Sequence, residues 1–367
     1  MKKAIFTLTL ISILYTACVP LRSIKYLIPD SRDSAIFDNQ TIQKSENPFY
    51  FKSYQANPAY AALKQKIDTS LIDTKTSAFI VIKNDSIIYQ HLSEDTNLQA
   101  KQPSFSISKS FVGTLVGIAV DRGQIKSTND LVIKYLPELA KNDERFNRLT
   151  IQHVLDMRSG FDVNERSLNP FSKIVRSYYG ADLTKMVSKL KMKNEPNTVF
   201  EYQSLNTQIL GMILEKVTGK TLDVLLQENL WQPLGAESDA LWSVDKAGNI
   251  KSFCCINATA LDYAKLGRLY LNGGNWQGKQ LVSRDFIAQA RTGGTAKADY
   301  GYANWFLNPG RKALPAAPET AVTFQGAGRN IIYIDQQHDL LIVARWIANG
   351  DELNQLVAQV LAALPKY

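Results

Sequence analysis

The segment Phe105-Ser106-Ile107-Ser108-Lys109 decides the fold, because it opens a helix that is apolar on nearly every side. Between Ser106 and Val120 the apolar side chains cover almost the whole circumference of a helix with 3.6 residues per turn. Gly113 and Gly117 leave room for close neighbours. The sequence therefore predicts a buried central helix over residues 106–120.

Ser106 and Lys109 have the spacing of a nucleophile and its base. A serine and a lysine three residues apart lie on one face of a helix, so the amine can reach the hydroxyl. Burial lowers the pKa of a lysine because desolvation disfavours the charged form, and a neutral amine can accept the serine proton. The Ser106 N–H at the start of the helix faces a developing oxyanion. We predict that Ser106 is the nucleophile and Lys109 the base.

The spacing alone is weak evidence, because it recurs at Ser188 to Lys191 and at Ser243 to Lys246. The first pair lies in a polar helix and the second in a turn, so neither lysine would be desolvated. Only Ser106 opens a buried helix soon after a predicted β-hairpin.

Size and composition fit a large folded protein. The 367 residues are 45% hydrophobic and 21% charged, which is enough for a large core divided over two subdomains. The net charge of +8 comes from scattered Lys and Arg, without a basic run interleaved with aromatic residues. No nucleic-acid partner is expected.

The first 18 residues are predicted to be a signal peptide. Two lysines precede an apolar stretch over residues 4–17 that is too short to span a bilayer. Leu14-Tyr15-Thr16-Ala17-Cys18 resembles the lipobox of bacterial lipoproteins, in which the cysteine is lipidated. We predict lipidation of Cys18 and a membrane anchor in the bacterial cell envelope. Plain secretion is the alternative, since Tyr15 stands where an aliphatic residue is usual.

The other cysteines and the histidines predict neither a disulfide nor a metal site. Cys254 and Cys255 are adjacent, and the backbone geometry of adjacent cysteines is too strained for an ordinary disulfide. His91, His153 and His338 stand far apart, with no carboxylate or cysteine at ligand spacing. No metal or other cofactor is expected.

The order of elements predicts an α+β fold. Residues 19–45 are polar and aperiodic and suit a tether, and residues 46–365 form the catalytic domain. Its α/β part covers residues 46–105 and 250–365, beginning with a hairpin over residues 78–89. Strands are expected over residues 302–307, 321–324, 330–333 and 340–346, before a last helix over residues 352–364. Residues 106–250 form an all-α subdomain. The result is an α/β/α sandwich whose antiparallel sheet is flanked by helices.

Several segments, in this order, carry a resemblance to a known family: Phe105 to Lys109; Asp121-Arg122-Gly123-Gln124-Ile125; Tyr135-Leu136-Pro137-Glu138; Leu149-Thr150-Ile151 with Leu155-Asp156-Met157-Arg158-Ser159-Gly160; and Phe200-Glu201-Tyr202-Gln203-Ser204 with Leu210-Gly211. Over residues 50–365 the chain resembles the β-lactamase-related serine hydrolases. This family includes class C β-lactamases, D-alanyl-D-alanine carboxypeptidases, esterases and 6-aminohexanoate-dimer hydrolases. The resemblance implies a β-lactamase/transpeptidase-like fold.

The family's second motif, Tyr-x-Asn or Tyr-x-Ser, matches Tyr202-Gln203-Ser204. Tyr202 ends a loop and precedes a predicted helix, as the family pattern requires, and its phenol can relay protons beside Ser106 and Lys109. Tyr270-Leu271-Asn272 and Tyr302-Ala303-Asn304 are interpreted as chance matches, because one closes a helix and the other falls within a strand.

The third motif, normally Lys-Thr-Gly, has two candidates. Arg291-Thr292-Gly293-Gly294 follows a helix, whereas Gln325 to Asn330 lies between two strands, where the family places this motif. We prefer the second. By resemblance, the Ala327 N–H is the second oxyanion donor, and Gly326 and Ser204 belong to the same oxyanion and substrate set. Arg329 either replaces the missing lysine charge or is a surface residue.

The combined motifs predict a serine hydrolase that cleaves an amide or ester bond through an acyl-enzyme, without a cofactor. The missing lysine and the Tyr-x-Ser variant favour the 6-aminohexanoate-dimer hydrolase and esterase branch, with a small-molecule or short peptide-like substrate. One alternative is a β-lactamase or D,D-peptidase that acts on antibiotics or peptidoglycan. Another is a lipoprotein of the penicillin-binding type that does not turn over.

Overall fold

The computed structural model describes residues 30–53, 58–72, 76–167, 169–293, 297–305, 307–347 and 350–364, together with Ser23, Tyr26 and Thr74. The predicted signal peptide and Cys18 lie outside the described residues. In this part of the chain, no helix is long and apolar enough to cross a membrane.

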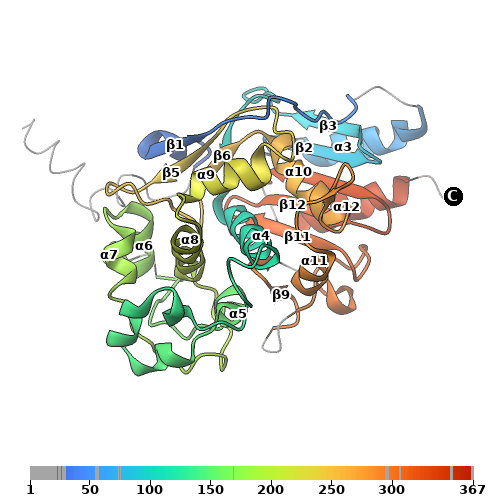
Figure 1. The fold of residues 1–367 in the computed structure, drawn as a ribbon. Coiled ribbons are helices and arrows are strands. Elements are labelled where there is room, and N and C mark those ends of the chain that lie inside the picture. Colours follow the sequence, from blue (N-terminus) through green and yellow to red (C-terminus); the bar gives the residue numbers. More distant parts are fainter. Residues whose placement is uncertain are drawn as a thin grey trace, which may run out of the picture.

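A five-stranded antiparallel sheet with the order β11-β12-β13-β2-β3 forms the core of the α/β part (Figure 1). Its strands are β2 (Ala78–Lys83), β3 (Ser86–Leu92), β11 (Val322–Gly326), β12 (Asn330–Asp335) and β13 (Leu340–Arg345). The predicted hairpin is confirmed as β2 and β3. Asn84 and Asp85 join them with φ values of 49° and 57°, the backbone that a two-residue hairpin turn requires.

Both faces of this sheet are covered, which explains why its strands are continuously apolar. Successive side chains of a strand point to opposite faces. Phe79 and Val81 pack in the cluster that contains α3 (Ala61–Leu71) and α12 (Gly350–Ala363). Ile80 and Ile82 belong to the other cluster, with α10 (Ala260–Leu271). The predicted α/β/α layering is confirmed.

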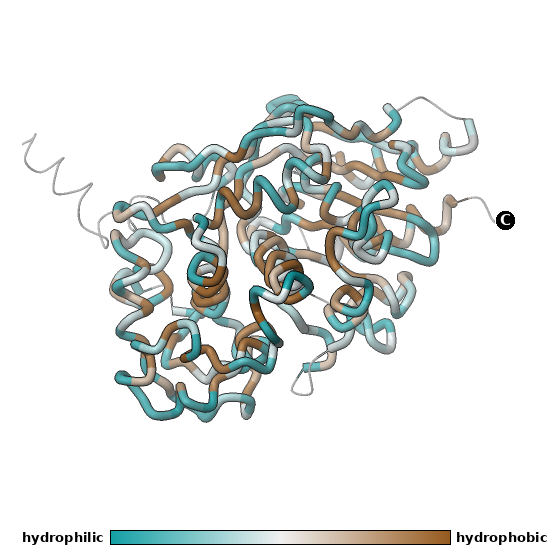
Figure 2. The backbone as a smooth tube through the Cα atoms, in the orientation of Figure 1, coloured by the Kyte–Doolittle hydropathy of each residue, from teal (hydrophilic) through white to brown (hydrophobic). Residues whose placement is uncertain are grey.

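The central helix is α4 (Ser108–Asp121), preceded by the 3₁₀ turn η3 (Phe105–Ile107). Residues 108–119 are all buried, and Figure 2 shows this apolar helix in the middle of the molecule. It packs against α8 (Ser204–Thr218). Gly113 is needed at one contact, since a Cβ there would lie 2.7 Å from the Tyr302 carbonyl oxygen. The predicted buried helix is confirmed, with Ser106 in the turn before it.

The remaining elements are mostly short. The other α-helices are α5 (Ile151–Leu155), α6 (Lys173–Tyr179), α7 (Leu183–Val187), α9 (Leu222–Leu226) and α11 (Arg284–Ala290), and η7 (Gln227–Trp231) is a π-helix. The 3₁₀ helices are η1 (Asp33–Ile36), η2 (Pro58–Tyr60), η4 (Val132–Lys134), η5 (Pro137–Lys141), η6 (Glu144–Arg148) and η8 (Pro309–Arg311). Two-residue strand pairs are β7 (Asn275–Trp276) with β8 (Lys279–Gln280) and β9 (Tyr300–Gly301) with β10 (Asn304–Trp305).

A second sheet differs from the sequence prediction. Its order is β1-β5-β6-β4, with β1 (Asp38–Ile42), β4 (Gln102–Pro103), β5 (Ala240–Val244) and β6 (Ile256–Ala258). Strand β1 lies in the segment expected to be a tether, and β5 in the part expected to be all helical. Both expectations were wrong at these strands. Four of the five residues of β1 are not buried, so no apolar pattern marks this strand in the sequence. Its position in the sheet is set by backbone pairing with β5.

Cys254 and Cys255 form a disulfide, contrary to the prediction that they would not. Their Cα atoms are 3.7 Å apart, closer than the usual range of about 4.4–6.8 Å. The backbone accommodates the bond because Cys255 adopts a left-handed φ of 73°. The prediction failed because it assumed ordinary backbone geometry.

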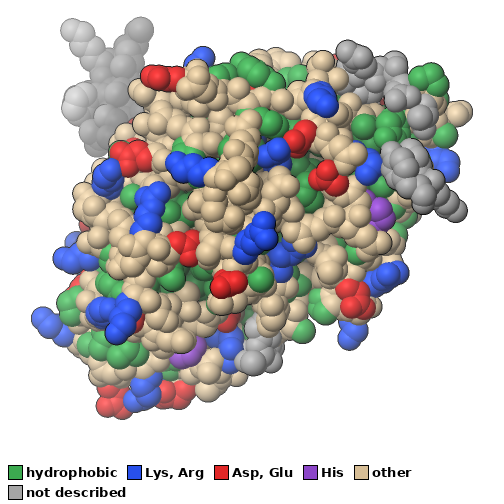
Figure 3. Space-filling view, turned by 45° about the vertical axis from the view of Figure 1, so that its right-hand side comes forward, with side chains coloured by type: hydrophobic (Ala, Val, Ile, Leu, Met, Phe, Trp, Pro, Cys, Tyr) green, Lys and Arg blue, Asp and Glu red, His purple; other side chains and the backbone are tan. Residues whose placement is uncertain are grey.

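Charge on the surface is mixed. On the face drawn in Figure 3, Lys and Arg side chains are interspersed with Asp and Glu and do not form a continuous basic band. This distribution agrees with scattered charge in the sequence.

The covered sheet predicts a large cost for removing a side chain from its α10 face. Ile332 is fully buried, and a Cβ on Gly267 of α10 would lie 2.8 Å from its Cγ2 atom. We expect Ile332→Ala to lower the free energy of unfolding by about 2–5 kcal/mol through lost burial and a cavity. The matched control Ile72→Ala, at a residue that is 64% exposed, should change it by less than about 0.5 kcal/mol. Urea denaturation measures the free energy of unfolding of both variants. Equal losses in the two variants would contradict the placement of Ile332 in the buried core.

Candidate active site

Ser106 is presented by a tightly held turn. Strand β4 leads into Ser104, whose backbone N donates to the Ile256 carbonyl at 2.6 Å, and whose Oγ atom lies 2.7 Å from Ser108 Oγ. Phe105 then adopts a φ of 45°, a left-handed conformation that costs a bulky residue about 1–3 kcal/mol. Ser106 follows and is partly exposed. The strained turn therefore leaves the predicted nucleophile accessible at the start of a buried helix.

Lys109 is completely buried and has three hydrogen-bond partners. Its Nζ atom lies 3.1 Å from Ser106 Oγ, 3.3 Å from Ser204 Oγ and 2.9 Å from the Phe253 carbonyl oxygen. Burial lowers the pKa of Lys109 to about 7, and the nearby Glu165 carboxylate partly opposes this change. A substantial fraction of the amine is thus neutral near pH 7.

Tyr202 completes the predicted triad. Its hydroxyl donates to Ser106 Oγ at 2.8 Å, and Lys109 Nζ lies 5.0 Å from the centre of its ring. The ring also contacts Tyr300 edge to face. Tyr202 stands at the end of a loop just before α8, as the sequence predicted. The structure thus brings the three predicted catalytic residues within hydrogen-bonding distance around one oxygen atom.

Ser204, which the sequence assigns to the oxyanion and substrate set, lies beside Lys109. Its Oγ accepts from Lys109 Nζ, its backbone N donates to Glu165 Oε2 at 3.1 Å, and its hydroxyl donates to Glu165 Oε1. Only 5% of the residue is exposed. Both of its donors are thus engaged by Glu165, and its place in the oxyanion and substrate set stays a prediction.

Gly326 and Ala327 lie where the preferred third motif was expected. Gly326 ends β11, and a Cβ on it would lie 2.2 Å from the Ser104 carbonyl oxygen and 3.2 Å from Ser106 N. Only glycine permits this approach. Ala327 follows in the turn before β12 and is exposed.

Arg329 lies two residues beyond Ala327. It is exposed and, with Gly328 and Trp346, lines a cavity of about 860 Å³.

The competing motif matches lie elsewhere. Lys246 is 56% exposed and pairs with Asp38, while Lys191 is also exposed. The hydroxyls of Tyr270 and Tyr302 contact Thr114 and Gln289. Arg291, at the end of α11, binds the Thr320 carbonyl. None of these contacts includes a residue of the predicted triad.

Two partners of Lys109 and Ser204 were missed by sequence reasoning. Glu165 comes from the irregular loop between α5 and α6, and its pKa is raised by burial, an effect that Lys109 opposes. No recognised motif marks it. The second partner, the Phe253 carbonyl, belongs to the backbone, so the identity of the side chain at position 253 gives no sign of its role.

Comparison with known proteins identifies the family. The family model described as Beta-lactamase matches residues 69–362. The chain belongs to the β-lactamase family. The predicted relationship to β-lactamase-related serine hydrolases is therefore confirmed.

Among curated relatives, the 6-aminohexanoate-dimer hydrolase of Paenarthrobacter ureafaciens is 30% identical over 68% of this chain and 66% of its own length. The solved structure "Putative 6-aminohexanoate-dimer hydrolase from Bacillus anthracis" is 21% identical, with a TM-score of 0.76 over 92% of this chain and 94% of its own. The solved structure of a family VIII carboxylesterase is 16% identical, with a TM-score of 0.65 over 84% of this chain and 98% of its own.

The Glu165 carboxylate near Lys109 predicts a shift in the pKa of that lysine. Replacing Glu165 with Gln removes a negative charge that favours the ammonium form of Lys109, so the pKa of Lys109 should fall below about 7. NMR titration of protein with ¹³C-labelled lysine side chains measures it. The matched control Glu195→Gln, at an exposed residue paired with Arg148, should leave the value unchanged. An unchanged or higher pKa in the Glu165 variant would contradict the arrangement.

Proposed function

We propose that this chain is a serine hydrolase that cleaves an amide or ester bond through an acyl-enzyme on Ser106. The observation that carries the proposal is the position of Ser106 Oγ, 3.1 Å from Lys109 Nζ and 2.8 Å from the Tyr202 hydroxyl. A nucleophile between a base and a proton relay is the arrangement that acyl transfer requires.

The base step uses the neutral form of Lys109. Its amine accepts the Ser106 proton as Oγ attacks the substrate carbonyl carbon, which becomes tetrahedral with the charge on its oxygen. With a lysine pKa of about 7, the reactive fraction rises as the pH increases through neutrality. The rate at low substrate concentration should follow that fraction.

Tyr202 is the proposed relay to the leaving group. The phenol gives its proton to the departing nitrogen or oxygen atom and then recovers a proton from Lys109. The acyl group remains bound to Ser106 Oγ as an ester. Water then attacks the ester and transfers its proton through the same groups. This step releases the acid and restores the Ser106 hydroxyl.

Two backbone donors are proposed to stabilise the oxyanion. Ser106 N lies at the start of the helical segment. Gly326, on which a Cβ would lie 3.2 Å from Ser106 N, directly precedes Ala327, whose N–H is the proposed second donor. Donors fixed before the reaction stabilise charge without reorganisation, and loss of one such donor commonly costs about 10²–10³-fold in kcat.

The proposed substrates are short linear amides and esters. The named activity of the 30% identical relative supports this choice, as does the lack of a lysine in the third motif. Arg329 is the basic residue nearest along the chain to the proposed oxyanion donor. Because it is exposed, its charge is also available to a substrate carboxylate.

A hydrolysis panel tests the proposal. Short aryl esters, short linear amides, penicillins and D-Ala-D-Ala peptides are compared for the native chain and Ser106→Ala. We expect turnover of esters or linear amides, with a loss of about 10³-fold or more in kcat for the variant. Ser188→Ala is the matched control, because the same change at a decoy motif should leave kcat unchanged.

The panel also distinguishes the alternatives. Preferential turnover of penicillins or D-Ala-D-Ala peptides would assign the chain to the β-lactamase or D,D-peptidase group. A stable adduct on Ser106 without turnover, seen by mass spectrometry, would assign it to the penicillin-binding type. No turnover and no acylation of Ser106 would overturn the proposal.

We also propose that the protein is exported and anchored by a lipid on Cys18. The basic start, the apolar stretch and the lipobox-like segment support this proposal. Cells expressing the full chain should incorporate labelled fatty acid into it, and Cys18→Ser should abolish that label. Labelled native protein would support anchoring, whereas unlabelled protein released from the cell would indicate plain secretion.

A further inference from the structure

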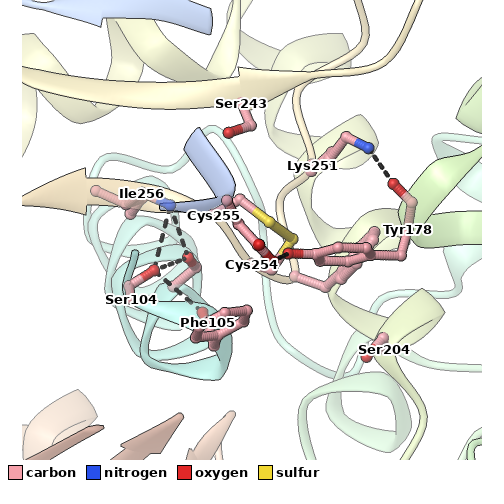
Figure 4. The surroundings of a disulfide bond; sticks show 12 residues. Ser104, Phe105, Tyr178, Ser204, Ser243, Lys251, Cys254, Cys255 and Ile256 are labelled. Carbon is pink, nitrogen blue, oxygen red and sulfur yellow. Dashed lines mark hydrogen bonds between the residues drawn. A yellow bond between two sulfur atoms is a disulfide. The ribbon is translucent and has the colours of Figure 1, made fainter. Parts of the chain in front are cut away.

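The Cys254–Cys255 disulfide lies between two contacts of the active site. The preceding residue, Phe253, places its carbonyl oxygen 2.9 Å from Lys109 Nζ. The following residue, Ile256, donates from its backbone N to Ser104 Oγ at 3.2 Å and accepts from Ser104 N at 2.6 Å. Figure 4 shows the disulfide next to Ile256 and Ser104. Four consecutive residues thus connect the base to the segment that carries the nucleophile.

The Phe253 carbonyl has a specific consequence for the direction of the Lys109 lone pair. A neutral amine has two N–H groups and one lone pair. The Phe253 carbonyl can only accept, and the Ser204 hydroxyl already donates to Glu165, so Ser204 Oγ is also an acceptor for Lys109. When both N–H groups bind these acceptors, the lone pair is left for Ser106.

We propose that the Cys254–Cys255 disulfide is a positioning element for this base, holding the Phe253 carbonyl where it orients Lys109 toward Ser106. This inference rests on the proposed serine hydrolase function. The disulfide fixes the backbone of two adjacent residues, including the left-handed conformation of Cys255. Opening it returns conformational freedom to both residues and removes the covalent support for that conformation.

Hydrogen bonds around the loop confine the effect to the site. The Trp242 indole N–H donates to the Cys254 carbonyl at 2.9 Å, and Ser243 N donates to the Cys255 carbonyl at 3.1 Å. Both cysteines are buried, with exposed fractions of 4% and 3%, in an apolar cluster that includes Leu183 and Phe253. None of these contacts involves the sulfur atoms' bond itself, so we expect them to keep the protein folded when that bond is opened, with the Phe253 carbonyl displaced.

The redox chemistry is a two-electron exchange. A dithiol reductant supplies two electrons and two protons, the sulfur–sulfur bond breaks, two cysteine thiols form, and the reductant closes its own disulfide. Reaction of the two thiols with an oxidised dithiol reverses each change. The proposed export would place the protein where such a bond persists.

The test compares three forms of the full chain in a Cys18→Ser background, in which Cys254 and Cys255 are the only cysteines. They are the oxidised protein, the protein reduced with dithiothreitol, and the double variant Cys254→Ser/Cys255→Ser. Intact mass establishes the redox state, since reduction adds two hydrogens. Circular dichroism and thermal unfolding establish that each form is folded. The double variant decides the result if the buried bond resists the reductant.

We expect the reduced and doubly substituted forms to lose about 10–100-fold in kcat on the best panel substrate, with a smaller change in KM. The acid limb of kcat/KM should also move to lower pH, because a carbonyl dipole favours the ammonium form of Lys109. Glu165 and Tyr202, which face Lys109 from other loops, are unchanged in all three forms. Reoxidation should restore both values. A folded double variant with the kinetics and pH profile of the oxidised protein would overturn the proposal.

A second readout separates this inference from the proposed function. The ¹³C chemical shift and pKa of the Lys109 side chain should change between the oxidised and opened forms, whether or not a substrate is known. If no panel substrate is hydrolysed and Ser106 is not acylated, the proposed function fails. An unchanged Lys109 signal in a verified open form refutes the positioning role independently.

Discussion

Complete burial of Lys109 is the constraint on which the rest of the site depends. A lysine in contact with water stays charged at neutral pH and cannot accept a proton from serine, whereas burial lowers its pKa to about 7. That burial requires a helix that is apolar on nearly all sides, since Lys109 belongs to α4 and must be surrounded with it. The same buried helix therefore supplies both the apolar core and the lowered pKa of Lys109.

Burying an amine also creates a need for hydrogen-bond partners. An unsatisfied buried amine is costly, and Ser204, Phe253 and Ser106 supply its three partners. These partners come from three separate parts of the chain, which the fold must bring together around α4. Helix α8 carries Ser204 and follows Tyr202, while the loop before β6 carries Phe253. The packing of α8 against α4 is therefore a condition for chemistry as well as for stability.

The sequence predicted those features that depend on local pattern. The apolar helix, the hairpin and the Tyr202 motif are each contained in a short segment, and each lies where expected. Glu165 and the Phe253 carbonyl could not be predicted, because their roles arise from contacts between distant segments. Strand β1 was missed because its polar residues pair through the backbone. The disulfide was missed because its formation depends on a left-handed conformation at Cys255 that no residue pattern indicates.

The same reasoning explains why the reaction type follows more directly from the structure than the substrate does. Lys109 lies in the buried helix α4, Ser106 in the turn before it and Tyr202 just before α8. Hydrogen bonds join Ser106 to the other two residues, so few other chemistries fit the arrangement. Ala327 and Arg329, in contrast, stand exposed in a turn between β11 and β12. Gly326 fixes one end of that turn against Ser104, since no larger residue fits there. The backbone donor proposed at Ala327 is thus constrained by the segment that carries Ser106, the proposed nucleophile, while the Arg329 side chain is free of that constraint. The proposed reacting groups are held tightly, whereas exposed side chains such as Arg329 are not. Within one fold, the substrate can therefore change while the proposed acyl transfer step is retained.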